Sequence, residues 1–264
     1  DEYYNGAWVL VGIIFYGIEL YADFTGGIDI TIGIAQVFGV KVAENFIRPY
    51  FSKNIAEYWR RWHISMGTWF RDYIFYPMSI SKRMGKLTKF CKTHFGKGVA
   101  KRVPVYLATM VTWFATGIWH GASWNFVLWG VYYGLFLLLE KFVLASLLER
   151  LPQWLRITYT MFVVMIGWVF FSQTDFSALG TYLGTLFGIG AAGFADSTAL
   201  YYLKTGFILF VVSILACRPG LYQQFKRLLQ RRPMTAVLVN FILLALSIAY
   251  MVYNSYTPFL YAKF

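Results

Sequence analysis

Six apolar blocks recur along the chain, and their length constrains the fold more than any other feature. They lie at 7–22, 103–119, 124–140, 156–172, 201–217 and 236–253. A helix needs about 20 mostly apolar residues to cross the hydrocarbon core of a bilayer. Because lipid offers the backbone no water to bond, such blocks form helices rather than open strands. We therefore predict an all-α, polytopic membrane protein with about six spanning helices, supplemented by re-entrant and amphipathic interfacial helices.

The basic residues are concentrated in a few segments of a chain whose formal net charge is +12. Segment 82–102 has eight Lys and Arg and no acid, segment 218–232 has five and no acid, and 173–200 has none. This alternation follows the positive-inside rule and predicts that 82–102, 141–156 and 218–232 are cytoplasmic. It places 173–200 and the C-terminus outside. Anionic membrane lipids, rather than nucleic acid, are the partners that such segments indicate.

The N-terminal part of the chain carries acids at apparent membrane depth. Asp23 and Asp29 flank Gly26 and Gly27, which favour a bent or re-entrant segment over a straight helix. The two carboxylates would line a polar cavity or form structural ion pairs. We treat 1–264 as a single membrane-embedded region. We expect it to be a fragment or a processed product, because no Met and no basic segment precede the first apolar block.

Residues 51–102 are the least membrane-like part of the chain. From Ser52, a suitable N-cap, the apolar and aromatic residues recur at helical spacing, and Glu57 and Arg61 form an i,i+4 pair. The Trp and Tyr content favours a position at the membrane interface. We predict one amphipathic helix that ends near Pro77, followed by a basic cytoplasmic loop.

The stretch "GIWHGASWNF" places His120 between two apolar runs. Ionisable groups within the bilayer are costly and tend to face a cavity or a partner. A neutral imidazole has a lone pair for general-base chemistry. Gly121 and Ala122 leave space beside it, and Trp119 and Trp124 are positioned to wall a site. A structural histidine that bonds a neighbouring helix is an equally good interpretation at this point.

His63 is the second candidate, in "EYWRRWHISMGTWFRDY". Arg60, Arg61 and Arg71 would bind the phosphates of an acyl donor as readily as lipid head groups. The alternative is an ordinary interfacial histidine on an aromatic, basic helix face.

The sequence does not predict a metal centre. Two histidines without further ligands at suitable spacing do not make a zinc site. Cys91 and Cys217 fall on the predicted cytoplasmic side, where thiols stay reduced. We therefore expect neither a metal nor a disulfide.

Three stretches resemble the membrane-bound O-acyltransferase (MBOAT) family, and the alginate-type polysaccharide O-acetylation branch within it. They are "YADFTGGIDITIGIAQVFGVKVAENFIRPY", "SKNIAEYWRRWHISMGTWFRDYIFYP" and "GIWHGASWNFVLWGVYYG". The terminal "NSYTPFLYAKF" is also similar to bacterial members. The resemblance implies that His120 is the catalytic histidine and that His63 lies near the path of the acyl donor. It also implies a fold that surrounds a thin central region, where a cytoplasmic donor meets an extracytoplasmic acceptor. Because family members carry further spans before the similar region, the resemblance implies that this chain is the C-terminal part of a longer protein.

The resemblance implies an enzyme that moves an acyl group, most simply acetyl, from a cytoplasmic thioester to a hydroxyl of an extracytoplasmic polysaccharide. The thioester, from acetyl-CoA or an acyl carrier, would be a co-substrate, with no bound cofactor. A periplasmic or extracellular acetyltransferase is a further expected partner. The remaining predicted substrate-binding residues are Trp59, Trp119, Trp124, Asn125 and Asp23. Two other classes stay open: a transporter or flippase, and a non-catalytic scaffold for a soluble acyltransferase.

Overall fold

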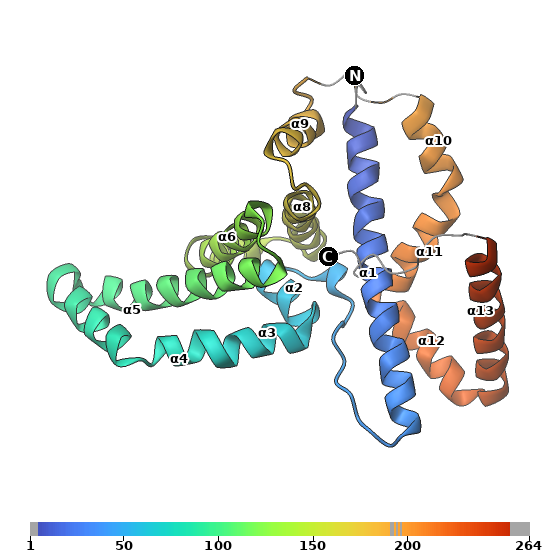
Figure 1. Cartoon of the computed structure of the whole chain (residues 1–264), viewed down its shortest axis with the longest axis horizontal. Coiled ribbons are helices and arrows are strands. Elements are labelled where there is room, and N and C mark those ends of the chain that lie inside the picture. The colour runs from blue at the N-terminus through green and yellow to red at the C-terminus, as the bar shows by residue number, and fades with distance from the viewer. Residues whose placement is uncertain (1–4, 191–192, 194, 196, 254–264) are drawn as a thin grey trace.

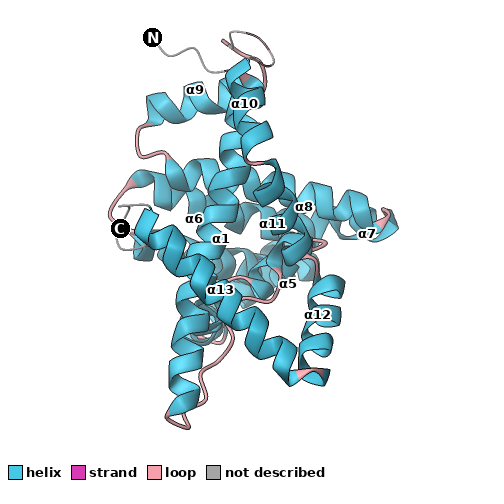
Figure 2. Ribbon diagram, turned by 90° about the vertical axis from the view of Figure 1, so that its right-hand side faces the viewer, coloured by secondary structure: helices cyan, strands magenta, loops and turns pink. Residues whose placement is uncertain are grey.

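The computed structural model describes residues 5–190, 193, 195 and 197–253, and this part of the chain contains helices and loops but no strand (Figures 1 and 2). The predicted all-α class is confirmed. The helices of the first half are α1 (Gly6–Val37), η1 (Pro49–Phe51), α2 (Ile55–Arg61), α3 (Ile64–Phe70), η2 (Arg71–Phe75), α4 (Tyr76–Ser79) and α5 (Lys82–His120). Those of the second half are α6 (Trp124–Leu139), η3 (Glu140–Leu144), α7 (Ala145–Arg150), α8 (Gln153–Ser172), α9 (Phe176–Leu186), α10 (Ser197–Thr205), α11 (Phe207–Cys217), α12 (Pro219–Arg231) and α13 (Pro233–Tyr253).

Within the described residues, four helical stretches are long and apolar enough to span a membrane. They are α1, the continuous stretch Trp124–Arg150, α8 and α13. The α10–α11 pair makes a fifth span when its 58° bend is counted within one crossing. The predicted block 103–119 forms the second half of α5, where threonines and tryptophans reduce the apolar content. The chain is therefore a multi-pass membrane protein.

The prediction of a bent or re-entrant segment at Gly26 and Gly27 is wrong. Helix α1 continues through both glycines to Val37. A glycine inside a helix costs only about 1 kcal/mol relative to alanine. Continuing the helix satisfies every backbone group internally, which is the stronger requirement in lipid.

The predicted single helix from Ser52 to Pro77 is also wrong in its details. Asn54 caps α2 by accepting a hydrogen bond from the Glu57 amide at 2.6 Å, whereas the Ser52 hydroxyl donates to the Pro49 carbonyl. The chain then breaks between α2 and α3, and Pro77 lies inside the short α4. The ion pair between Glu57 and Arg61 is confirmed, with an N···O distance of 2.5 Å.

The two basic segments are helices rather than the predicted loops. Segment 82–102 forms the first half of α5, which is kinked at Gly96 (φ 84°), and segment 218–232 is largely α12. Lys, Arg, Leu and Gln all favour helix. Charge indicates the side of the membrane and leaves the backbone conformation undetermined.

Helices α5 and α6 pack closely against each other as a helical hairpin (Figure 1). A Cβ at Gly130 would lie 2.3 Å from the Trp113 carbonyl oxygen, and one at Gly117 would lie 2.5 Å from that of Phe126. These glycines therefore permit close backbone contact between the two helices. Gly180 and Gly188 have open space where a Cβ would lie, so they make no such contact.

Candidate functional site

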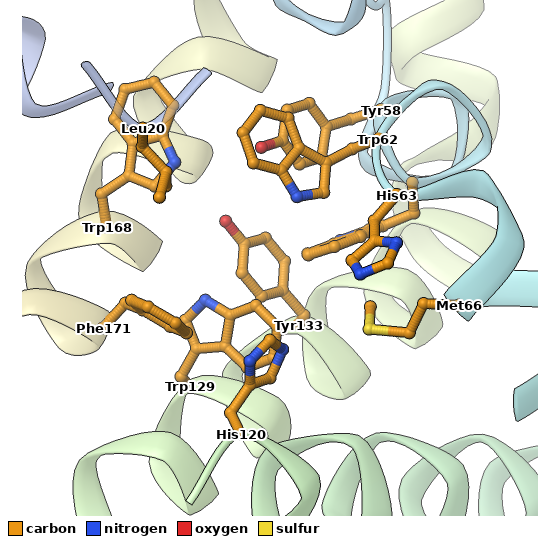
Figure 3. A pocket seen from close by; sticks show the side chains of 11 residues that line it. Leu20, Tyr58, Trp62, His63, Met66, His120, Trp129, Tyr133, Trp168 and Phe171 are labelled. Carbon is orange, nitrogen blue, oxygen red and sulfur yellow. The ribbon is translucent and has the colours of Figure 1, made fainter. Parts of the chain in front are cut away.

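His120 is the last residue of α5 and borders a small internal cavity, which we call the chamber (Figure 3). Gly121 follows with φ 155°, a conformation that favours glycine, and ends the helix there. The His120 ring packs edge-to-face on Trp129 and Phe171, with centroid distances of 4.8 and 5.2 Å. Its Nε2 atom is buried and has no hydrogen-bond partner within the described structure. A buried lone pair or N–H without a partner is costly, so this atom is available to a ligand.

The chamber has a volume of about 30 Å³, which is room for about one water molecule. Its lining comes from α1, α2, α3, α5, α6 and α8, so residues distant in sequence converge here. The lining residues are Leu20, Tyr58, Trp59, Trp62, His63, Met66, His120, Trp129, Tyr133, Trp168 and Phe171. Both predicted histidines are among them, and Figure 3 shows them on neighbouring sides of the space.

His63 occupies the break between α2 and α3 with φ 45° and ψ 55°. This left-handed conformation is uncommon for a residue with a side chain. The ring packs edge-to-face on Phe24 at 4.8 Å, and its Nδ1 lies 3.4 Å from Asn45 Oδ1. Burial among these groups lowers the pKa of His63 to about 4, because a desolvated imidazole disfavours its charged form. His63 is therefore neutral near pH 7.

A much larger cavity, with a volume of about 870 Å³, lies next to the chamber, and we call it the groove. Trp59 and Met66 line both spaces and form the partition between them. The Trp59 indole N–H is buried and has no hydrogen-bond partner among the described residues. These two side chains thus separate the groove from His120.

The groove contains four cationic side chains, from α2, η2, η3 and α8. They are Arg60, Arg71, Lys141 and Arg156. Arg71 is exposed and forms an ion pair with Asp72 at 2.8 Å. Glu140 and Glu149 also line the groove, so the cations outnumber the carboxylates. Excess positive charge suits a ligand that carries several negative charges, such as phosphates.

The other predicted site residues lie outside both cavities. Arg61 pairs with Glu57, and Asn125 is fully buried, donating to the carbonyls of Phe170 and Phe171. The remaining three are partly or largely exposed and line neither cavity: Asp23, Trp119 and Trp124. Trp119 still contacts the rings of both histidines, at centroid distances of 6.2 Å and 5.0 Å.

Glu140 also lines the groove, and the sequence analysis did not single it out. Its buried carboxylate accepts hydrogen bonds from the backbone amides of Ile55 and Ala56, at the start of α2. The available signal was a lone acid at the end of the apolar run 124–140. Tyr58, Met66 and Tyr133 were also missed, and no sequence pattern distinguishes them from ordinary core residues.

The arrangement offers acid–base chemistry beside a ligand-sized cavity. Two imidazoles border a chamber that only a small reacting group would fill, and a cation-lined groove adjoins it. In the part of the chain that the structure describes, no group of three or more His, Cys, Asp or Glu side chains comes close enough to hold a metal ion.

Comparison with known proteins gives related matches. The chain is 34% identical over 184 residues to the probable alginate O-acetylase of Pseudomonas fluorescens, covering 70% of this chain and 33% of that protein. It is 30% identical over 159 residues to the peptidoglycan O-acetyltransferase of Helicobacter pylori, covering 59% of this chain and 27% of that protein. It is 29% identical over 131 residues to the teichoic acid D-alanyltransferase of Streptococcus thermophilus, covering 49% of this chain and 29% of that protein.

The chain spans about a third of the length of these relatives. The sequence model of the membrane-bound O-acyltransferase family matches residues 3–179, which include His63, His120 and both cavities. The predicted resemblance is therefore confirmed over these residues. The similar terminal stretch, 254–264, lies outside the described residues. This chain belongs to the membrane-bound O-acyltransferase family.

Proposed function

We propose that the protein containing this chain transfers an acyl group, most simply acetyl, from a thioester donor to a hydroxyl of a polysaccharide. The observation that carries the proposal is the unpartnered Nε2 of His120 in a chamber next to a cation-lined groove. The three relatives described above are named for acyl transfer to alginate, peptidoglycan and teichoic acid, which supports the same reaction class.

In the proposed reaction His120 is the general base. Its Nε2 takes the proton of the acceptor hydroxyl while the oxygen forms a bond to the thioester carbonyl carbon. The tetrahedral intermediate then collapses, the C–S bond breaks, and the leaving thiolate takes the proton back from the imidazolium. The products are an ester and a thiol. Positioned proton transfer of this kind contributes roughly 10²–10⁴-fold to the rate.

The groove is the proposed site of the thioester donor. Arg60, Arg71, Lys141 and Arg156 would bind phosphates of the donor, whether it is acetyl-CoA or an acyl carrier. Trp59 and Met66 would then separate to admit the acyl group to the chamber. No resident cofactor enters this scheme.

The proposed topology places donor and acceptor on opposite sides of the membrane. The basic helical segments, 82–102 and 218–232, would be cytoplasmic, and the C-terminus would lie outside. The acceptor would thus approach from the extracytoplasmic side, with a periplasmic or extracellular acetyltransferase as a further proposed partner.

The decisive experiment measures acyl transfer by the full-length protein, reconstituted with a radiolabelled acetyl thioester and a polysaccharide acceptor. His120→Ala and the bulkier His120→Gln should each lower turnover by about 10²-fold or more. His94→Ala is the matched control, because His94 is an exposed histidine on the same helix. Its turnover should equal that of wild type.

Wild-type turnover in a folded His120→Gln variant would contradict the mechanism. If deletion of the whole protein still abolished acylation in cells, that result would instead favour a scaffold role. Size-exclusion profiles and thermal melts of each variant establish that it is folded.

A further inference from the structure

The break between α2 and α3 is held by the chain segment that follows α1. The Ile64 amide donates to the Asn45 carbonyl at 3.0 Å, and the Ile47 amide donates to the Arg61 carbonyl at 2.9 Å. These two hydrogen bonds bracket His63. A left-handed residue with a side chain costs of order 1 kcal/mol or more and persists where surrounding contacts over-determine it.

The Asn45 side chain reaches the same break and is buried there. Its Oδ1 accepts from the Ser65 amide at 3.0 Å and from the Ser65 hydroxyl at 2.6 Å. A backbone amide can only donate, so the atom facing it must be the oxygen of Asn45 rather than the side-chain nitrogen. The orientation of this amide group is therefore chemically fixed.

The fixed Asn45 oxygen determines which ring nitrogen of neutral His63 carries the proton. Nδ1 of His63 lies 3.4 Å from Asn45 Oδ1, and two acceptors facing each other would not attract. In a neutral imidazole one nitrogen carries the proton and the other a lone pair. A proton on Nδ1 leaves the lone pair on Nε2. Figure 3 shows one ring nitrogen of His63 on the side that faces His120 and the chamber.

We propose that Asn45 is a positioning residue that holds His63 in the Nδ1-protonated tautomer, so that Nε2 faces the chamber as a hydrogen-bond acceptor. The assignment rests on the proposed acyl transfer and gives His63 a definite part in that reaction. His63 accepts a hydrogen bond from an N–H or O–H group of a reactant. It does not donate to the developing oxyanion, because its donor nitrogen points to Asn45.

The titratable groups that share the chamber with His63 are His120, Tyr58 and Tyr133. None of them is a carboxylate, so a carboxylate placed at position 45 would be a new charge beside the ring. Asn45→Asp keeps the shape and both acceptor bonds to Ser65. It also favours the protonated imidazole, since an opposite charge within about 4–6 Å stabilises a charged group.

The experiment uses nuclear magnetic resonance of the full-length protein labelled with ¹⁵N-histidine in lipid nanodiscs. His63→Gln assigns the resonances. Wild type should show a protonated Nδ1 and a bare Nε2 at neutral pH. Asn45→Asp should raise the titration midpoint of His63 by about 1–3 pH units and move the acid limb of the transfer rate upward with it. Glu44→Gln is the control, because this neighbour is exposed, and both quantities should stay unchanged.

Two results would overturn the proposal: a bare Nδ1 in wild type, or an unmoved midpoint in Asn45→Asp. A midpoint that moves while the pH dependence of transfer stays the same would support the tautomer assignment. That third result would remove His63 from the proposed reaction. The two failures are therefore distinguishable.

Discussion

The helices around the chamber and the four helices at the C-terminal end of the described chain are built differently. Helix α8 alone contributes seven buried residues, whereas α12 and α13 contribute none. Helices α10 and α11 each contribute a single buried residue, Ala199 and Cys217. Their ring contacts with the rest include Phe15 with Phe210 at 6.2 Å. The family match ends before these four helices begin.

The difference in burial between the two regions follows from what surrounds their helices. Helices around the chamber must fix side chains from six elements against one another, so their contacts are dense and aromatic. Helix α13 is apolar yet has no buried residue, as expected of a helix that faces lipid. Four predictions test this difference in packing.

The largest effect is expected from Gly130→Leu at the α5–α6 contact. The added Cβ would lie 2.3 Å from the Trp113 carbonyl, and backbone cannot move aside without separating the two helices. We expect loss of folded protein, measured as the monodisperse fraction in detergent. Gly220→Leu in α12 is the control, because nothing lies within 4 Å of its Cβ position. Equal loss in both variants would contradict the comparison.

A smaller effect is expected from Glu140→Ala. Removing the carboxylate leaves the amides of Ile55 and Ala56 without their acceptor, at about 1–3 kcal/mol for each buried group. A thermal melt should show a lowered transition, and Glu140→Gln, which keeps an acceptor, should show a smaller decrease. Glu149→Ala, an exposed carboxylate of the same groove, should melt like wild type.

Val164→Ala and Leu243→Ala compare packing in the two regions directly. Val164 in α8 is 0% exposed, and Leu243 in α13 is 55% exposed. The first change opens a cavity and should cost about 1–2 kcal/mol, whereas the second exchanges one lipid-facing side chain for another. Reversible unfolding in mixed micelles would measure both. A comparable cost at Leu243 would show that α13 is packed against protein.

The last prediction concerns a dependence of stability on pH, which is confined to acidic conditions. The imidazole of His63 titrates near 6.5 in an unfolded chain and near 4 in the folded protein. The unfolded state therefore binds more protons between these values, and the stability present above pH 6.5 is lost as pH falls toward 4. The melting temperature of His63→Gln should decline less over this range than that of wild type or of His94→Gln.

The sequence was sufficient to predict the helical class, because lipid leaves the backbone few alternatives. It also pointed to His120 and His63, although their shared chamber was implied by the family resemblance rather than by spacing. The break at His63 was not predictable from local preference, since no glycine or proline marks it. Ile64 and Ser65 donate hydrogen bonds to Asn45 across that break, and a single sequence does not show such contacts between residues distant in the chain.

The charge pattern was misleading about the backbone conformation and only partly informative about which cations line the groove. The basic stretches were interpreted as loops, yet both are helical. The predicted phosphate ligands Arg60 and Arg71 reach the groove, while Arg61, adjacent to Arg60, pairs with Glu57 instead. Neighbours on a helix point in different directions, so a run of arginines predicts a function for only some of its members.

The partition formed by Trp59 and Met66 would limit hydrolysis of the thioester donor by the proposed enzyme. A thioester resting beside a basic imidazole is open to hydrolysis, and the chamber has room for about one water molecule. Keeping the thioester carbonyl behind two hydrophobic side chains would prevent its hydrolysis while no sugar hydroxyl is bound. Smaller residues at these positions would then raise the wasteful release of free acid while leaving productive transfer in place.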